Sequence, residues 1–206
     1  MAEEQVFFVS DNIKLEGLLQ FRRGNKGVAV THPHPLFGGS MHNGVVQSLV
    51  DVYRQAGYTT LRFNFRGVGS SRGEYDQGKG EQKDVQAALN YLVLRSQAAI
   101  DLAGYSFGAW VNALLQPAKD IVKRMIMISP PVAFLDFAAV QALPQLELVI
   151  AGSQDQIAPP ELIKTALPNW NPLARLEVIE GADHFYGWHT GRLESILAAH
   201  LRAQPI

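Results

Sequence analysis

The amino-acid sequence predicts an α/β fold with a mostly parallel sheet of about seven to eight strands, helices on both faces and an antiparallel hairpin at the amino end. Segments rich in β-branched and aromatic residues alternate with segments whose apolar residues recur at helical spacing. Of the 206 residues, 47% are hydrophobic and 18% are charged, as in a globular domain with a substantial core. No repeat, linker or low-complexity segment interrupts this pattern, so residues 1–206 are expected to form a single domain.

The expected elements follow from periodicity and from turn residues. Asp11 and Asn12 separate the two strands of the hairpin, and Gly57 ends the first helix, where helix C-termini favour glycine. The expected strands are 6–10, 15–20, 27–31, 58–65, 100–103, 122–128, 146–150 and 175–179. The expected helices are 45–57, 85–93, 107–116, 160–166 and 191–202. In such sheets ligands bind at the carboxyl ends of the strands, so functional residues are expected in the loops that follow them.

Charge and composition narrow the range of partners. The net charge is -1 and no long run of like charge appears, so nucleic acid is not an expected partner. The amino end, MAEEQVFFVS, lacks the features of a secretory signal, and the apolar runs are far shorter than the ~20 residues of a membrane span. A soluble, cytoplasmic protein is expected. The chain has no cysteine for a disulfide, a metal or a nucleophile, and the sequence leaves open whether it forms a homo-oligomer.

The most informative loop is GYSFG, from Gly104 to Gly108, between the strand IDLA and the helix FGAWVNALL. It matches GxSxG, a sharp strand-to-helix turn whose small flanking residues let the serine project its hydroxyl. Ser106 is therefore the expected nucleophile. The alternative is a tight glycine turn with an inert serine.

A serine hydroxyl needs a base to take its proton, and the base needs an acid to hold its tautomer. Asp155 follows the strand LELVI and His184 follows the strand RLEVI, which gives the chain order serine, acid, histidine. All three residues are expected at one rim of the sheet. Asp136, which follows the strand MIMIS, is a competing acid.

Other candidates near these residues are less well placed. Asp183 is adjacent to the expected base but cannot reach around it. His189 and His200 lie toward or within the last helix and are expected to be surface or packing residues.

The stretch THPHPLFGG, residues 31–39, allows two interpretations. His32 and His34 could bind a metal with His42 and Asp51, but no compact ligand spacing follows, so no metal site is expected. The second interpretation is an oxyanion hole, which needs two backbone N-H donors.

The proline residues select one donor in this loop. One N-H of an oxyanion hole comes from the residue after the nucleophile, here Phe107, and the other from the loop after the third strand. Pro33 and Pro35 have no N-H, so His34 is the expected second donor, with Leu36 behind it.

Together, GYSFG, the ordered Asp155 and His184 and the histidine-proline loop resemble the α/β-hydrolase superfamily across essentially the whole chain. HPHPLFGGSMHN and LRFNFRGVGSSRGEYDQGKGE resemble small, lidless bacterial hydrolases related to dienelactone hydrolases and serine esterases. The resemblance maps a His-Gly-X-Pro turn onto residues 32–35, with His34 as donor and Pro33 where glycine is usual. Relatives of dienelactone hydrolase often carry a cysteine nucleophile, so Ser106 favours an esterase.

GEYDQGKG, residues 73–80, resembles a nucleotide-binding loop but ends in Gly80, where Ser or Thr is needed for magnesium. A flexible loop that caps the next helix is expected instead. Arg66 and Arg72 could meet an anionic substrate, but local carboxylates such as Glu74 or Asp76 are their expected partners.

The sequence leaves no room for a cap domain over the site, because only about 17 residues, 129–145, precede the strand at 146–150. An open site favours a small or exposed acyl group. The candidate substrate-binding residues are Leu36, Phe37, Tyr105 and Phe185, with Phe107, Phe134 and Trp188 also near the rim.

These residues predict a serine hydrolase that cleaves a carboxylic ester of a small-molecule substrate through an acyl-enzyme, without a cofactor. A peptidase, acyltransferase or thioesterase with the same three residues is one alternative. A non-catalytic binding protein on a hydrolase scaffold is another.

Overall fold

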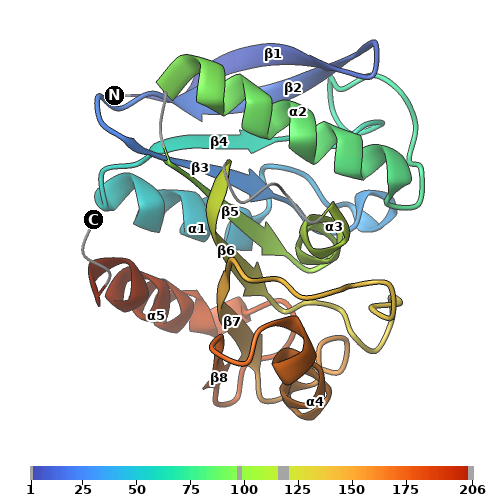
Figure 1. The fold of residues 1–206 in the computed structure, drawn as a ribbon, viewed down its shortest axis with the longest axis vertical. Coiled ribbons are helices and arrows are strands. Elements are labelled where there is room, and N and C mark those ends of the chain that lie inside the picture. Colours follow the sequence, from blue (N-terminus) through green and yellow to red (C-terminus); the bar gives the residue numbers. More distant parts are fainter. Residues whose placement is uncertain (1, 97–98, 116–120, 204–206) are drawn as a thin grey trace.

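The computed structural model describes residues 2–96, 99–115 and 121–203, and these contain an eight-stranded sheet (Figure 1). Its strands are β1 (Glu4–Ser10), β2 (Ile13–Gln20), β3 (Lys26–Thr31), β4 (Thr59–Phe63), β5 (Ala99–Tyr105), β6 (Val122–Ile128), β7 (Leu146–Gly152) and β8 (Arg175–Ile179). They lie in the order β1-β2-β4-β3-β5-β6-β7-β8. The pairs β1/β2 and β2/β4 are antiparallel and all others are parallel, which confirms the predicted sheet and hairpin.

Helices cover both faces of the sheet, as predicted (Figure 1). They are α1 (Gly44–Gln55), α2 (Lys79–Ser96), α3 (Phe107–Leu115), α4 (Pro160–Trp170) and α5 (Thr190–Ala203), with short 3-10 turns η1 (Pro35–Phe37) and η2 (Gly187–His189). One hydrophobic core contains buried residues of α1 and α5, and the other contains those of α2, α3 and α4. Residue 116, the predicted end of α3, lies outside the described residues.

Two helices extend well beyond the predicted ranges. α2 begins at Lys79, before its apolar stripe, because the Glu81 carboxylate accepts hydrogen bonds from the N-H groups of Asp76 and Gly78. α4 continues through Pro168 to Trp170, whose side chain is buried in the core. The start of α2 thus depends on a local cap by Glu81, and the end of α4 on the burial of Trp170, neither of which the apolar periodicity shows.

The sheet order creates a topological switch point between β3 and β5. From β3 the chain moves to β4 on one side, and then returns to β5 on the other side of β3. Loops that follow two such strands diverge and leave a crevice in which ligands bind. The loop after β3 contains His34 and the turn after β5 contains Ser106.

The connection from β6 to β7, residues 129–145, forms no helix or strand, in agreement with the predicted lack of a cap domain. Among the described residues, no helix combines the length and apolar character needed to cross a membrane.

Candidate active site

Ser106 occupies a sharp turn between β5 and α3. Its φ is +54°, in the left-handed region, which costs a non-glycine residue roughly 1–3 kcal/mol and persists only where the surroundings enforce it. Its N-H donates to the carbonyl of Ile128, 2.9 Å away, on the neighbouring strand β6. The Ser106 side chain is therefore held at the carboxyl end of the sheet.

The two glycines of GYSFG make this turn sterically possible. A Cβ at Gly104 would lie 2.5 Å from Nδ2 of Asn112, and a Cβ at Gly108 would lie 2.5 Å from Oγ1 of Thr31. Asn112 Nδ2 in turn donates to Thr31 Oγ1 over 3.0 Å, and both side chains are fully buried. This hydrogen bond joins α3 to β3 beneath the turn, a contact that no sequence pattern predicted.

Ser106, His184 and Asp155 form a chain of hydrogen bonds. His184 Nε2 lies 2.9 Å from Ser106 Oγ, and His184 Nδ1 lies 3.0 and 2.9 Å from the two carboxylate oxygens of Asp155. The relative exposures of the three residues are only 7%, 7% and 3%, respectively. Residues from three separate loops thus meet in a site that is largely withdrawn from water.

The charge state of Asp155 determines the direction of these hydrogen bonds. Burial acts to raise the pKa of Asp155, but hydrogen bonds from His184 and the N-H of Ala158 outweigh it and keep the pKa below its ordinary value. The ionised carboxylate can only accept, so His184 Nδ1 carries the proton. Nε2 is then the acceptor for the Ser106 hydroxyl, the arrangement required of a general base.

The competing residues have other partners. The Asp136 carboxylate accepts from the N-H of Ala138 at 2.7 Å, and the Asp183 carboxylate accepts from the N-H of Phe185 at 3.0 Å. His200 is buried in α5, with Nε2 3.1 Å from the Glu147 carboxylate, which agrees with its expected packing role.

The loop after β3 is held by the ring of His32. Its Nδ1 lies 2.7 Å from the Pro33 carbonyl oxygen, and its Nε2 accepts from the N-H of Phe65 at 3.0 Å. Burial lowers the pKa of His32 to about 4, so the ring is neutral and Nδ1 carries its proton. In a trans peptide the C=O and N-H point in opposite directions, so this bond directs the His34 N-H away from His32.

The predicted N-H donors, His34 and Phe107, line the same cavity as Ser106 and His184. Neither N-H donates to another protein group in the described part of the chain. Two free donors beside a serine hydroxyl have the composition of an oxyanion hole.

The histidines of the loop are not arranged as metal ligands. Both ring nitrogens of His32 are hydrogen-bonded, and so are both of His34, to the N-H of Leu36 and the hydroxyl of Tyr75. Within residues 2–96, 99–115 and 121–203, no three His, Cys, Asp or Glu side chains cluster as they would around a metal ion.

The cavity has a volume of about 440 Å³ and a mostly apolar wall. Of the predicted substrate-binding residues, Phe37, Tyr105 and Phe185 contribute to the wall, whereas Leu36 does not and is 66% exposed. Trp188 is likewise absent from the wall and is fully exposed. Further wall residues, which the sequence pattern did not indicate, are Asn43, Pro131, Leu135 and Ile157.

Tyr105 has a second contact. Its side chain is almost entirely buried, and its hydroxyl donates to the carbonyl of His184 at 2.8 Å. Tyr105 thus helps to hold the loop that carries His184, in addition to forming part of the cavity wall.

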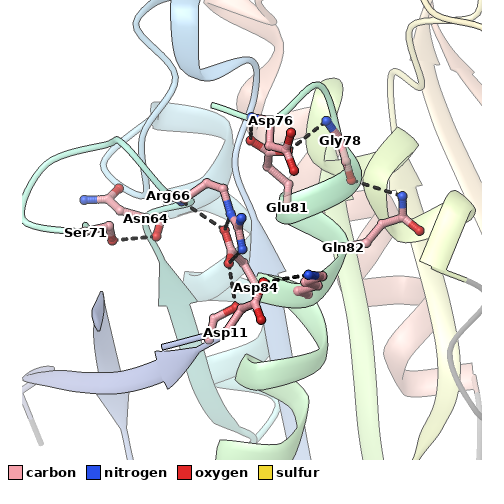
Figure 2. Close-up of polar contacts among 11 residues, drawn as sticks. Asp11, Asn64, Arg66, Ser71, Asp76, Gly78, Glu81, Gln82 and Asp84 are labelled. Carbon is pink, nitrogen blue, oxygen red and sulfur yellow. Dashed lines mark hydrogen bonds and ion pairs between the residues drawn. The ribbon is translucent and has the colours of Figure 1, made fainter. Parts of the chain in front are cut away.

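The glycine-rich loop, defined here as residues 67–80, is hydrogen-bonded to the first turn of α2, in agreement with the predicted cap (Figure 2). The Glu81 carboxylate accepts hydrogen bonds from the N-H groups of Asp76 and Gly78, so these N-H groups are not available to bind a phosphate.

The expected pairing of Arg66 with Glu74 or Asp76 is wrong. Its guanidinium instead binds the fully buried Asp84 of α2, at 2.8 and 3.1 Å.

Comparisons with known proteins show which sequences and folds are similar to this chain. No protein-family model matches the sequence. An uncharacterised protein of Rickettsia prowazekii is 33% identical over 209 residues, which cover 96% of this chain and 88% of the relative. An α/β serine hydrolase homologue from Coxiella burnetii is 34% identical, with a TM-score of 0.88 and 98% of both chains covered.

A serine hydrolase without a lid from Xanthomonas campestris is 30% identical, with a TM-score of 0.90, and the match covers 98% of this chain and 95% of the other. The closer kinship with dienelactone hydrolases stays a prediction. Because sequence identity and fold agree over nearly the whole chain, this protein belongs to the α/β-hydrolase superfamily.

Proposed function

We propose that this protein is a serine hydrolase that cleaves carboxylic esters through an acyl-enzyme intermediate. The observation that carries the proposal is the hydrogen-bonded chain from Ser106 through His184 to Asp155 at the wall of an apolar cavity. It supplies a nucleophile, a base and an acid that orients the base.

In the first half of the reaction, His184 Nε2 takes the proton of Ser106 while Oγ attacks the ester carbonyl. The N-H groups of His34 and Phe107 stabilise the oxyanion of the tetrahedral intermediate. Asp155 stabilises the imidazolium that forms. The imidazolium then protonates the departing alcohol, and the acyl group remains on Ser106.

In the second half, His184 takes a proton from a water molecule, which attacks the acyl-enzyme carbonyl. The same two N-H groups stabilise the second oxyanion, and the Ser106 oxygen leaves with the proton held on His184. The products are a carboxylic acid and the free enzyme.

The lining of the cavity favours a substrate whose acyl group is uncharged and either small or exposed at its far end. No Asp, Glu, Lys or Arg is among the described residues that line it, so a charged acyl group would be buried without a partner. The rim residues Phe37, Phe134 and Phe185 are largely exposed, which leaves the mouth open to a protruding chain.

The experiment is a panel of p-nitrophenyl esters, thioesters and short peptides, tested with the wild type, Ser106→Ala and a control, Ser195→Ala. Ser195 lies on the exposed side of α5, where its hydroxyl donates to the carbonyl of Gly191. Hydrolysis of short acyl esters by the wild type and Ser195→Ala, but not by Ser106→Ala, is expected. Cleavage of peptides or thioesters in preference to esters would instead favour a peptidase or a thioesterase, and turnover by Ser106→Ala would remove the proposed mechanism.

A further inference from the structure

Tyr75, in the middle of the glycine-rich loop, contacts the side chain of His34. Its hydroxyl oxygen lies 3.2 Å from His34 Nε2, and the two rings have centroids 5.1 Å apart. Tyr75 does not line the cavity, so its hydroxyl has no direct access to a substrate there. We propose that Tyr75 is a positioning residue that holds the His34 ring and, through it, the His34 backbone N-H that serves the oxyanion, an inference that rests on the proposed function.

The direction of this hydrogen bond is determined by the other nitrogen of the ring. The N-H of Leu36 points to His34 Nδ1 at 3.2 Å, and a backbone N-H can only donate, so Nδ1 carries no proton. A neutral imidazole then has its proton on Nε2 and donates it to the Tyr75 oxygen. Burial lowers the pKa of His34, which favours this neutral form. The ring thus bridges its own 3-10 turn, η1, and the glycine-rich loop.

Aromatic contacts hold the His34 ring on several sides. The ring centroids of Phe37 and Phe107 lie 4.7 and 4.8 Å from that of His34, and Tyr75 also contacts Phe107 at 5.9 Å. Tyr75 therefore touches both residues whose N-H groups are proposed as oxyanion donors.

Hydrogen bonds and close packing hold the segment that follows Tyr75, so that Tyr75 can position another residue (Figure 2). Glu81 accepts from the N-H groups of Asp76 and Gly78 at 2.9 and 2.8 Å, immediately after Tyr75. Gly78 packs so closely on α3 that an added Cβ would lie 2.4 Å from the Trp110 ring.

The start of the loop is anchored as well. The Arg66 backbone N-H and guanidinium both bind the buried Asp84 of α2. The N-H of Gly67 also donates to the carbonyl of Arg72 at 3.2 Å. The loop is thus fixed at both ends to α2, and its middle presents Tyr75 to His34.

The test uses Tyr75→Phe, which keeps the ring and removes only the oxygen that accepts from His34. Its matched control is Tyr91→Phe, because Tyr91 lies in α2 away from the site and packs against Phe8. For Tyr75→Phe, kcat for a short ester should fall about three- to tenfold with KM unchanged. The affinity for a trifluoromethyl ketone, whose adduct on Ser106 carries an oxyanion, should fall by the same factor. Tyr91→Phe should change neither value, and the unfolding temperature of both variants should match the wild type.

A double-mutant cycle separates positioning through His34 from a general structural role. In a His34→Ala background, Tyr75→Phe should have no further effect on kcat, because the contact through which it acts is already gone. Full activity of Tyr75→Phe in the wild-type background, or an equal loss in both backgrounds, would overturn the inference. If the wild type itself neither hydrolyses esters nor reacts with a fluorophosphonate, the proposed function fails instead, so the two failures are distinguishable.

Discussion

The ring of His32 holds the carbonyl of Pro33 at 2.7 Å, and this carbonyl belongs to the peptide unit whose N-H is that of His34. The buried imidazole is therefore a support for the proposed oxyanion donor. Its other nitrogen accepts from the N-H of Phe65, which links the loop after β3 to the end of β4.

Stability should depend on pH through His32. Its pKa is about 6.5 in an unfolded chain and about 4 in the fold, so the unfolded state binds more protons between these values. The contribution of His32 to the free energy of unfolding is thus fully present above pH 6.5. It decreases by roughly 3 kcal/mol as the pH falls to 4. Urea denaturation of the wild type and His32→Asn at several pH values measures this contribution.

His32→Asn retains a side-chain N-H but does not titrate, so its stability should fall less steeply in this pH range. His42→Asn, at an exposed histidine, is the control and should keep the wild-type slope. Equal slopes for the wild type and His32→Asn would show that His32 is not held neutral by the fold.

Asp155→Asn should lower kcat by about ten-thousand-fold, because an amide at this position no longer holds the proton on His184 Nδ1. Asp136→Asn should retain most of the activity, since Asp136 caps a local turn instead. Steady-state kinetics on a short ester compare the two variants. A larger loss of kcat in Asp136→Asn than in Asp155→Asn would instead identify Asp136 as the acid.

Gly108→Ala should destabilise the fold by about 1–3 kcal/mol and lower activity. Its Cβ would lie 2.5 Å from Thr31 Oγ1 and 2.8 Å from the His32 carbonyl, so the turn beneath Ser106 would have to shift. Gly191→Ala in α5, where an added Cβ meets nothing within 4 Å, is the matched control and should be nearly neutral. Urea denaturation gives both values, and a fully stable, active Gly108→Ala would show that the turn tolerates a side chain.

Two substitutions of His34 distinguish the role of its backbone N-H from that of its ring. His34→Pro should lose about 2.7–4 kcal/mol of transition-state stabilisation, because proline has no N-H and the φ of -57° at this position suits proline. His34→Ala keeps the N-H and should therefore retain much more activity than His34→Pro. The ratio of kcat/KM values measures the difference. Equal losses would assign the main role to the ring.

Most of the fold and the three central residues of the site were predictable from the sequence, because strand patterns and helix patterns alternate regularly along it. Alternating strands and helices predicted the sheet, and the rule that loops after parallel strands share one rim brought Ser106, Asp155 and His184 together. The glycines of GYSFG indicate a crowded turn from the sequence alone.

The unpredicted features depend on contacts between distant elements. Asp84, in the second turn of α2, binds Arg66 beyond the end of β4, and Asn112 of α3 binds Thr31 of β3. The bond between Tyr75 and His34 joins residues 41 positions apart in two loops. Leu36 lies on the outer side of η1, an orientation that depends on the local turn rather than on composition.

Peptide mapping after reaction with a fluorophosphonate tests directly whether Ser106 is the nucleophile and whether His184 activates it. We expect one adduct per chain, on Ser106, in the wild type and in Ser195→Ala, and a greatly slowed reaction in His184→Ala. An adduct on another residue, or equally rapid labelling of His184→Ala, would contradict this expectation.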